Sequence, residues 1–125
     1  MLANVLAYGA SLAIAFWGVA HIVKTAPVVA GFEPLSHDNR LVLKMEWILE
    51  GVTLCFIGLL VSAATLVSDP DDSVVRLVYR GSALMLLIMA AVSPFTGARA
   101  AQLPYKLCPV IFSSAAFFLV LASVV

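Results

Sequence analysis

The chain has 125 residues, 63% of them hydrophobic and 11% charged, with a mean hydropathy of +1.10. Soluble domains are roughly 45–50% apolar and about 25% charged, and a globule this small has too much surface to hide so many apolar side chains. The composition therefore predicts a polytopic α-helical membrane protein, and the long continuous apolar runs exclude a transmembrane β-barrel. Seven basic and seven acidic residues cancel, and no charged block indicates a nucleic-acid partner.

The first expected helix covers residues 2–24 and carries no charge before its last residue, Lys24. Because no basic segment or cleavage site accompanies its apolar run, we expect a retained helix and not a removed signal peptide. Trp17 and His21 are four residues apart and share one face. Trp17 is most simply an interfacial or packing aromatic. For His21, a structural imidazole bonded to a neighbouring helix and a functional group fit the sequence equally well.

The connector that follows, residues 25–39, contains Pro27, Gly31 and Pro34. These residues argue against a continuous helix, and the apolar residues between them favour a segment lying on the membrane interface. At its end, Ser36 and the polar residues after it offer an N-cap oxygen to the next helix.

The second expected helix, residues 40–67, is long and apolar enough to cross a bilayer. Its first three turns nevertheless contain four charged residues: Arg40, Lys44, Glu46 and Glu50. Charges in a membrane-spanning helix are costly and usually mark a functional site. Glu46 and Glu50 are four residues apart, so both carboxylates project from the same face. At a rise of about 1.5 Å per residue, Glu50 lies roughly 15 Å below Arg40, near the middle of the bilayer core.

Small residues predict close packing between the first two helices. On the second helix, Gly51 and Gly58 fall on nearly one stripe, which Ser62 continues. The first helix carries its own set of small residues: Ala3, Ala7, Ala10, Ala13 and Gly18.

The third expected helix covers residues 70–93, with Asp69 as its N-cap and Pro94 just after its end. Arg80 then lies roughly 15 Å along this helix. Because the second and third helices run antiparallel, Arg80 and Glu50 approach the same depth from opposite sides. We expect an ion pair between them, since two buried charges are tolerated better together than alone. The alternative is that Arg80 extends outward to the membrane surface.

The fourth expected helix covers residues 106–125, after a connector at 94–105. Cys108 lies near the start of this helix, and Cys55 lies well inside the second helix. Their depths differ by more than roughly 10 Å, whereas a disulfide requires Cα atoms within about 7 Å. Both cysteines are therefore expected to be packing residues. The chain has no CxxC and no zinc-type spacing, so no metal site is expected.

The four helices predict a single transmembrane domain, residues 1–125, folded as an all-α, antiparallel four-helix transmembrane bundle. Connectors 25–39 and 94–105 then share one side, together with five of the seven basic residues: Lys24, Arg40, Lys44, Arg99 and Lys106. The positive-inside rule places both connectors in the cytoplasm and both termini outside a cell (inner) membrane.

A ligand-binding site is expected on the connector side, formed by six residues: Trp17, His21, Glu46, Trp47, Glu50 and Arg80. Histidine and carboxylate groups can bind or relay protons, and they can equally recognise the polar head of a lipophilic ligand whose tail lies between helices. A single helix-borne histidine excludes bis-histidine haem within one chain. No phosphate loop, nucleophile elbow or other catalytic motif is present, so we leave open whether the protein is an enzyme.

Residues 10–67 resemble the DoxX-like family of small four-helix membrane proteins. In that family the first helix ends with Gly-x-x-His/Lys, and the second opens with Glu-Gly followed by a Gly-Leu-Leu step. The matching residues here are Gly18, His21, Glu50, Gly51, Gly58, Leu59 and Leu60. The resemblance implies a membrane redox accessory role, such as quinone-linked sulfur-compound oxidation, but no catalytic residue. The family's basic residues before the first helix are missing here.

Three functions follow as hypotheses. The first is a redox accessory that binds a lipophile such as a quinone. The second is a proton-coupled transporter formed by a homodimer, because four helices enclose little space for an aqueous path. The third is a structural subunit of a larger membrane complex, whose charges only hold helices together. The expected partners are the lipid bilayer, a lipophilic small molecule, and further copies or other membrane subunits.

Overall fold

The structure is a computed structural model that describes all 125 residues. It contains four α-helices, α1 (Leu2–Ala30), α2 (His37–Val67), α3 (Ser73–Val92) and α4 (Leu103–Ala122), and two single 3-10 turns, η1 (Ser93–Phe95) and η2 (Gly97–Arg99), that link α3 to α4. Each α-helix is long and apolar enough to cross a membrane. The fold is therefore the all-α, four-helix membrane bundle that the composition predicted.

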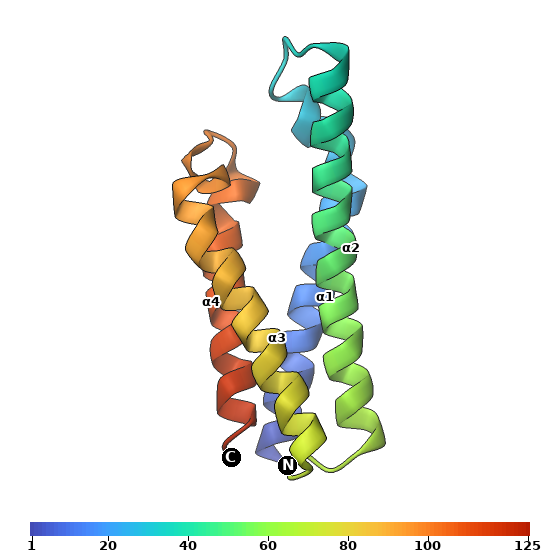
Figure 1. The fold of residues 1–125 in the computed structure, drawn as a ribbon, viewed down its shortest axis with the longest axis vertical. Coiled ribbons are helices and arrows are strands. Elements are labelled where there is room, and N and C mark those ends of the chain that lie inside the picture. Colours follow the sequence, from blue (N-terminus) through green and yellow to red (C-terminus); the bar gives the residue numbers. More distant parts are fainter.

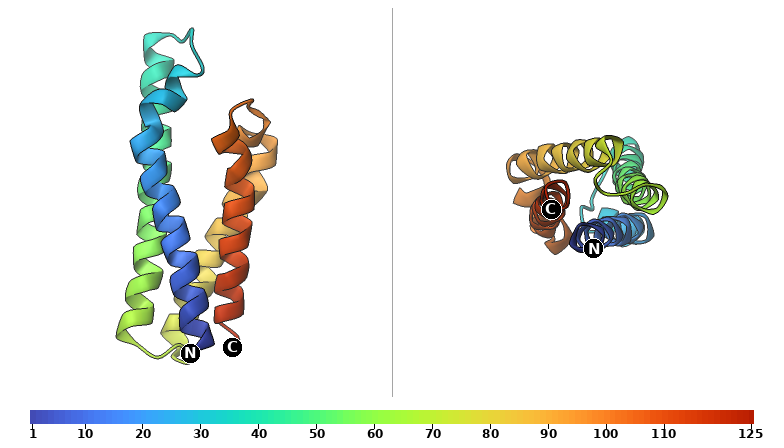
Figure 2. Two further views of the ribbon diagram at one scale, coloured as in Figure 1. Left: turned by 180° about the vertical axis from the view of Figure 1, so that it is seen from behind. Right: turned by 90° about the horizontal axis from the view of Figure 1, so that it is seen from below.

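The helices run up and down in sequence, and they form two pairs (Figure 1). α1 packs mainly against α2, and α3 packs mainly against α4, whereas α2 and α3 make little contact. The two pairs cross near the termini and spread apart toward the other end, as the view from behind also shows (Figure 2). Both termini lie at the crossing end, and both connectors of the α1–α2 and α3–α4 hairpins lie at the open end.

The predicted stripe of small residues on α2 is confirmed as the contact surface with α1. Gly58 lies so close to α1 that a β-carbon there would stand 2.6 Å from the Ser11 carbonyl oxygen. One turn on, the Ser62 hydroxyl donates to the Ser11 hydroxyl at 2.9 Å. Small side chains let the two backbones approach, and dispersion contacts along the whole seam then hold the pair together.

An apolar core of 17 buried residues fills the crossing region of the four helices. Tyr79 of α3 is fully buried in it, and its hydroxyl lies 2.8 Å from the hydroxyl of Thr65 on α2. Since the Thr65 hydroxyl donates to the Val61 carbonyl, it accepts from Tyr79. Large side chains such as Phe16, Leu66 and Phe117 point outward and are more than half exposed, as lipid contact requires.

The first two helices are longer than predicted. α1 continues through Pro27 to Ala30, where the sequence predicted a break after residue 24. Proline removes one hydrogen bond and its ring crowds the carbonyl four residues earlier. The next turn is retained nevertheless, because Val28 and Val29 are buried. α2 begins three residues early, at His37, with the Ser36 hydroxyl accepting from the Asn39 N–H as its N-cap.

The last two helices are shifted relative to prediction. α3 begins at Ser73 and not at residue 70, because Asp72 provides the N-cap by accepting from the Val74 N–H. Asp69, the expected cap, instead closes a turn by accepting from the Asp71 N–H. α4 begins at Leu103, three residues before the predicted start, with a proline in its first turn. It ends at Ala122, three residues before the predicted end of the helix.

Candidate functional site

His21 lies at the centre of the site, in the last third of α1, and is 2% exposed. Its Nδ1 is 2.8 Å from the Trp17 carbonyl oxygen, one turn earlier on the same helix. A carbonyl oxygen only accepts, so Nδ1 carries the proton and donates it to this bond. In the neutral imidazole the other nitrogen, Nε2, then presents its lone pair toward the neighbouring helices.

Two side chains from other helices face that lone pair. Glu50 Oε1 of α2 and Cys108 Sγ of α4 each lie 3.8 Å from His21 Nε2. Cys108 is 4% exposed, whereas the Glu50 side chain is 31% exposed. His21 is the only basic side chain within 4 Å of Glu50, because the two ion pairs of the chain are Arg40–Glu33 and Arg76–Asp71. Three helices thus bring one nitrogen, one oxygen and one sulfur atom together.

Aromatic rings hold the imidazole from its sides. Trp47 of α2 stacks on His21 with ring centroids 4.1 Å apart and planes inclined by 26°. Trp17 meets the imidazole edge to face at 5.4 Å. Tyr105 of α4 packs against Trp47 with ring centroids 4.7 Å apart. These contacts fix the plane of the ring, so Nε2 points in one direction.

A cleft of about 540 Å³ opens beside the cluster, between the spread halves of the bundle. Glu46, Glu50, Tyr105 and Cys108 line its polar part. Its apolar wall comes from α3 and α4: Ile88, Met89, Val92 and Phe112. The volume falls within the roughly 300–1,000 Å³ that is typical of small-molecule sites.

The tryptophans leave two buried donors unused. The indole N–H groups of Trp17 and Trp47 have no hydrogen-bond partner, and both rings line a small cavity of about 100 Å³ that also touches His21. A buried donor without a partner costs about 1–3 kcal/mol. Two such groups beside one imidazole indicate a place where a molecule with acceptor atoms would be stabilised.

Arg80 does not belong to this site, and the predicted Arg80–Glu50 ion pair is wrong. The Arg80 guanidinium donates to the hydroxyl and the carbonyl oxygen of Ser123, at the carboxyl end of α4. At about 1.5 Å per residue, Arg80 lies roughly 10 Å along α3 from Ser73, whereas Glu50 lies roughly 25 Å along α2 from Val67. Measured from the shared turn, the two residues are therefore at different depths. The prediction measured the depth of Glu50 from Arg40, at the other end of a helix that is longer than the roughly 30 Å bilayer core.

The other predicted site residues are brought together, with Glu46 at the edge. His21, Trp17, Trp47 and Glu50 form the cluster, whereas Glu46 is exposed and contributes only to the wall of the cleft. Cys108 and Tyr105 were not predicted. A signal for both existed, because the end of the first helix and the start of the fourth lie on the same side of an up-down-up-down bundle.

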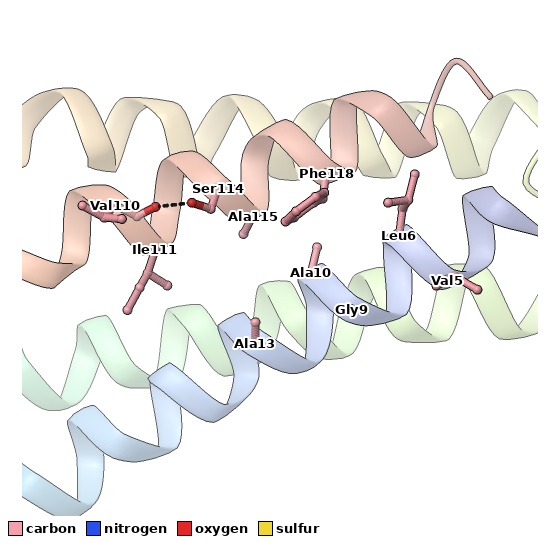
Figure 3. Close-up of a pocket in the computed structure, with 10 residues that line it drawn as sticks. All are labelled: Val5, Leu6, Gly9, Ala10, Ala13, Val110, Ile111, Ser114, Ala115 and Phe118. Carbon is pink, nitrogen blue, oxygen red and sulfur yellow. Dashed lines mark hydrogen bonds between the residues drawn. The ribbon is translucent and has the colours of Figure 1, made fainter.

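A second pocket, of about 390 Å³, lies between α1 and α4 near the termini. Figure 3 shows its two faces, with Ala10 and Ala13 on α1 and Ala115 and Phe118 on α4. Its one hydroxyl, on Ser114, donates to the Val110 carbonyl of the same helix at 2.7 Å. This pocket therefore has no free polar group that could bind a polar ligand, in contrast to the cleft at Glu50.

Comparison of the chain with protein-family models, with characterised proteins and with solved structures gives no match. The class of the protein therefore comes from its own fold and site. It is a multi-pass, four-helix membrane protein with a histidine, a carboxylate and a thiol gathered beside a cleft between its helices.

Proposed function

We propose that this protein binds a lipophilic molecule with a polar head, such as a quinone or its reduced quinol form, and serves as an accessory to membrane redox chemistry. The observation that carries this proposal is the cleft at Glu50, which joins a polar end to an apolar wall. A head group would contact Glu50, Tyr105 and Cys108. The tail would lie along the apolar side chains of α3 and α4 and leave between the two helix pairs.

The polar end of the cleft has the chemistry that such a head requires. The Tyr105 hydroxyl can donate to a carbonyl oxygen, and the Glu50 carboxylate can accept from a hydroxyl group. The unpartnered indole N–H groups of Trp17 and Trp47 belong to a separate small cavity that also touches His21. A quinone presents acceptors and a quinol presents donors, so the site offers partners to both forms. The redox part of the proposal also draws on the resemblance of residues 10–67 to the DoxX-like family.

The two other functions receive less support. A proton-coupled transporter needs a polar path to the far side. Within one chain the region below the cleft is an apolar core that includes Tyr79, Leu86 and Phe112, so such a path would have to lie between two copies of the chain. A purely structural subunit needs its buried charges to lock helices together, yet Arg80 and Glu50 do not pair. We further propose that the protein lies in a cell (inner) membrane with its connectors in the cytoplasm, which rests on the distribution of basic residues.

Thermal unfolding with and without ligand tests the proposed binding. The chain has two tryptophans, both at the site, so their fluorescence reports unfolding there. A ligand that binds only the folded state raises the melting temperature. We expect a short-tailed benzoquinone or its quinol to raise Tm in detergent solution, and Glu50→Gln to remove most of the shift obtained with the quinol.

Glu33→Gln is the matched control, because Glu33 pairs with Arg40 on an exposed connector away from the cleft. It should keep the full ligand-induced shift. The measurements are made with a metal chelator present, so that bound metal ions do not contribute. If no quinone or quinol raises Tm, or if Glu50→Gln and Glu33→Gln retain the same shift, the cleft does not bind this class of ligand.

A further inference from the structure

We propose that His21, Glu50 and Cys108 form a binding site for a divalent transition-metal ion of the Zn²⁺ type. The three ligand atoms, Nε2, a carboxylate oxygen and Sγ, all lie within 4.8 Å of one another. They come from α1, α2 and α4, so no spacing within one segment of the sequence could indicate the site. The inference does not depend on the lipophilic ligand proposed above.

The distances are close to those that a metal ion needs. Zn²⁺ binds nitrogen and oxygen at about 2.0–2.1 Å and sulfur at about 2.3 Å, which puts tetrahedral ligand atoms roughly 3.3–3.7 Å apart. Two of the three separations here, from Nε2 to Oε1 and from Nε2 to Sγ, are 3.8 Å. A small inward movement completes the geometry. Glu50 can supply it, because its side chain is partly exposed and borders the open cleft.

The histidine is already prepared for coordination. Metal-binding histidines commonly donate their second ring N–H to a carbonyl or carboxylate, which fixes the tautomer and the ring orientation. His21 does this through Nδ1 and the Trp17 carbonyl. Its stacking on Trp47 holds the ring plane. The lone pair of Nε2 is thereby directed at the position between Glu50 and Cys108.

Charge favours a divalent ion at this position. Cysteine binds metal as the thiolate, with release of its proton to solvent. A neutral imidazole, a carboxylate and a thiolate then carry two negative charges, and Zn²⁺ makes the complex neutral. Neutral complexes avoid most of the cost of burying charge in a membrane protein. No lysine or arginine forms an ion pair with Glu50, so the carboxylate has no other strong cationic partner.

The ligand set also selects the kind of metal. Mg²⁺ and Ca²⁺ prefer oxygen ligands in greater number, whereas a mixed nitrogen, sulfur and oxygen set suits Zn²⁺ and related ions. Three protein ligands leave the fourth tetrahedral position free. Glu50 and Cys108 both line the cleft, so that position would be reached from the cleft, as in zinc sites that bind an exchangeable molecule.

Co²⁺ substitution tests the site with the metal alone. Co²⁺ bound to a thiolate gives a near-ultraviolet charge-transfer band, and Zn²⁺ removes the band by displacement. We expect the full chain in detergent, with any purification tag cleaved, to bind one Co²⁺ and show this band. Cys108→Ser should abolish it. Glu50→Gln should weaken binding by about 10-fold or more, a loss at least as large as that from removing a group that hydrogen-bonds a metal ligand.

Cys55→Ser is the matched control. Cys55 is the other free cysteine and lies on α2 against the Ala15 carbonyl of α1. This variant should keep the band, and the helical circular dichroism of Cys108→Ser should match that of the wild type. The proposal is overturned if the wild type shows no thiolate band, or if the band survives in Cys108→Ser. Either result leaves the quinone test unaffected, because that test is made with a chelator present.

Discussion

Gly18 of α1 and Gly51 of α2 lie directly against each other. A β-carbon on Gly18 would stand 2.6 Å from the Gly51 carbonyl oxygen, and one on Gly51 would stand 2.7 Å from the Gly18 carbonyl oxygen. The contact is reciprocal, so neither helix can shift without the other. Since His21 is three residues after Gly18 and Glu50 directly precedes Gly51, this contact sets the distance between the two functional groups.

Gly51→Ala should therefore disturb both stability and the site. The added methyl group would also meet Ile22 Cγ1 at 2.8 Å and His21 Cβ at 3.0 Å. Overpacking of this kind costs about 1–3 kcal/mol, and the resulting separation of α1 from α2 moves His21 away from Glu50. We expect a lower melting temperature, measured by circular dichroism in detergent, and weaker Co²⁺ binding.

Gly81→Ala is the control for this prediction, because a β-carbon at Gly81 on α3 meets nothing within 4 Å. It should leave the melting temperature unchanged or raise it slightly, since alanine is the better helix former. Equal effects of the two substitutions would mean that the contact between α1 and α2 does not determine the position of the site.

Arg80 and Glu50 should behave as independent residues. Arg80 bonds Ser123 near the crossing end of the bundle, whereas Glu50 contacts His21 far above it. We expect the stability changes of Arg80→Leu and Glu50→Leu to add in the double variant within about 0.5 kcal/mol, as they do for distant sites. Chemical unfolding of the four proteins measures the coupling. If the double variant recovers the stability lost in either single variant, Arg80 and Glu50 do form an ion pair, contrary to the structure.

The orientation of the protein in the membrane can be tested by labelling the two ends of the bundle. Asp38 lies at the connector end, and Asp71 lies in the turn between α2 and α3 at the other end. In right-side-out membrane vesicles, a membrane-impermeant maleimide should label Asp71→Cys and not Asp38→Cys, because the distribution of basic residues predicts that the connectors face the cytoplasm. The unaltered chain, with Cys55 and Cys108, gives the background signal. The reverse labelling would show that the termini face the cytoplasm.

The sequence by itself determined the class of the protein, its four spans and most of the polar site. Hydropathy is a local property, so long apolar runs show where helices cross a membrane. Because burying charged or ionisable groups in a membrane is costly, the sequence alone indicated Glu50 and His21 as candidate site residues. The stripe at Gly51 and Gly58 was also readable, because close helix packing in a membrane requires small side chains at a regular spacing.

Only the tertiary structure decided which side chains complete the site. Depth along a helix is informative only when the helices begin at known levels, and here α1 and α2 have 29 and 31 residues while α3 and α4 have 20 each. Both connectors lie at the same end, so the offset between the two helix pairs and the rotation of α4 set Cys108 beside His21. Arg80 and Glu50 are apart for a simpler reason, since they lie at very different distances from the turn that joins α2 to α3. Offset and rotation result from packing over whole helix faces, which no short segment of the chain encodes.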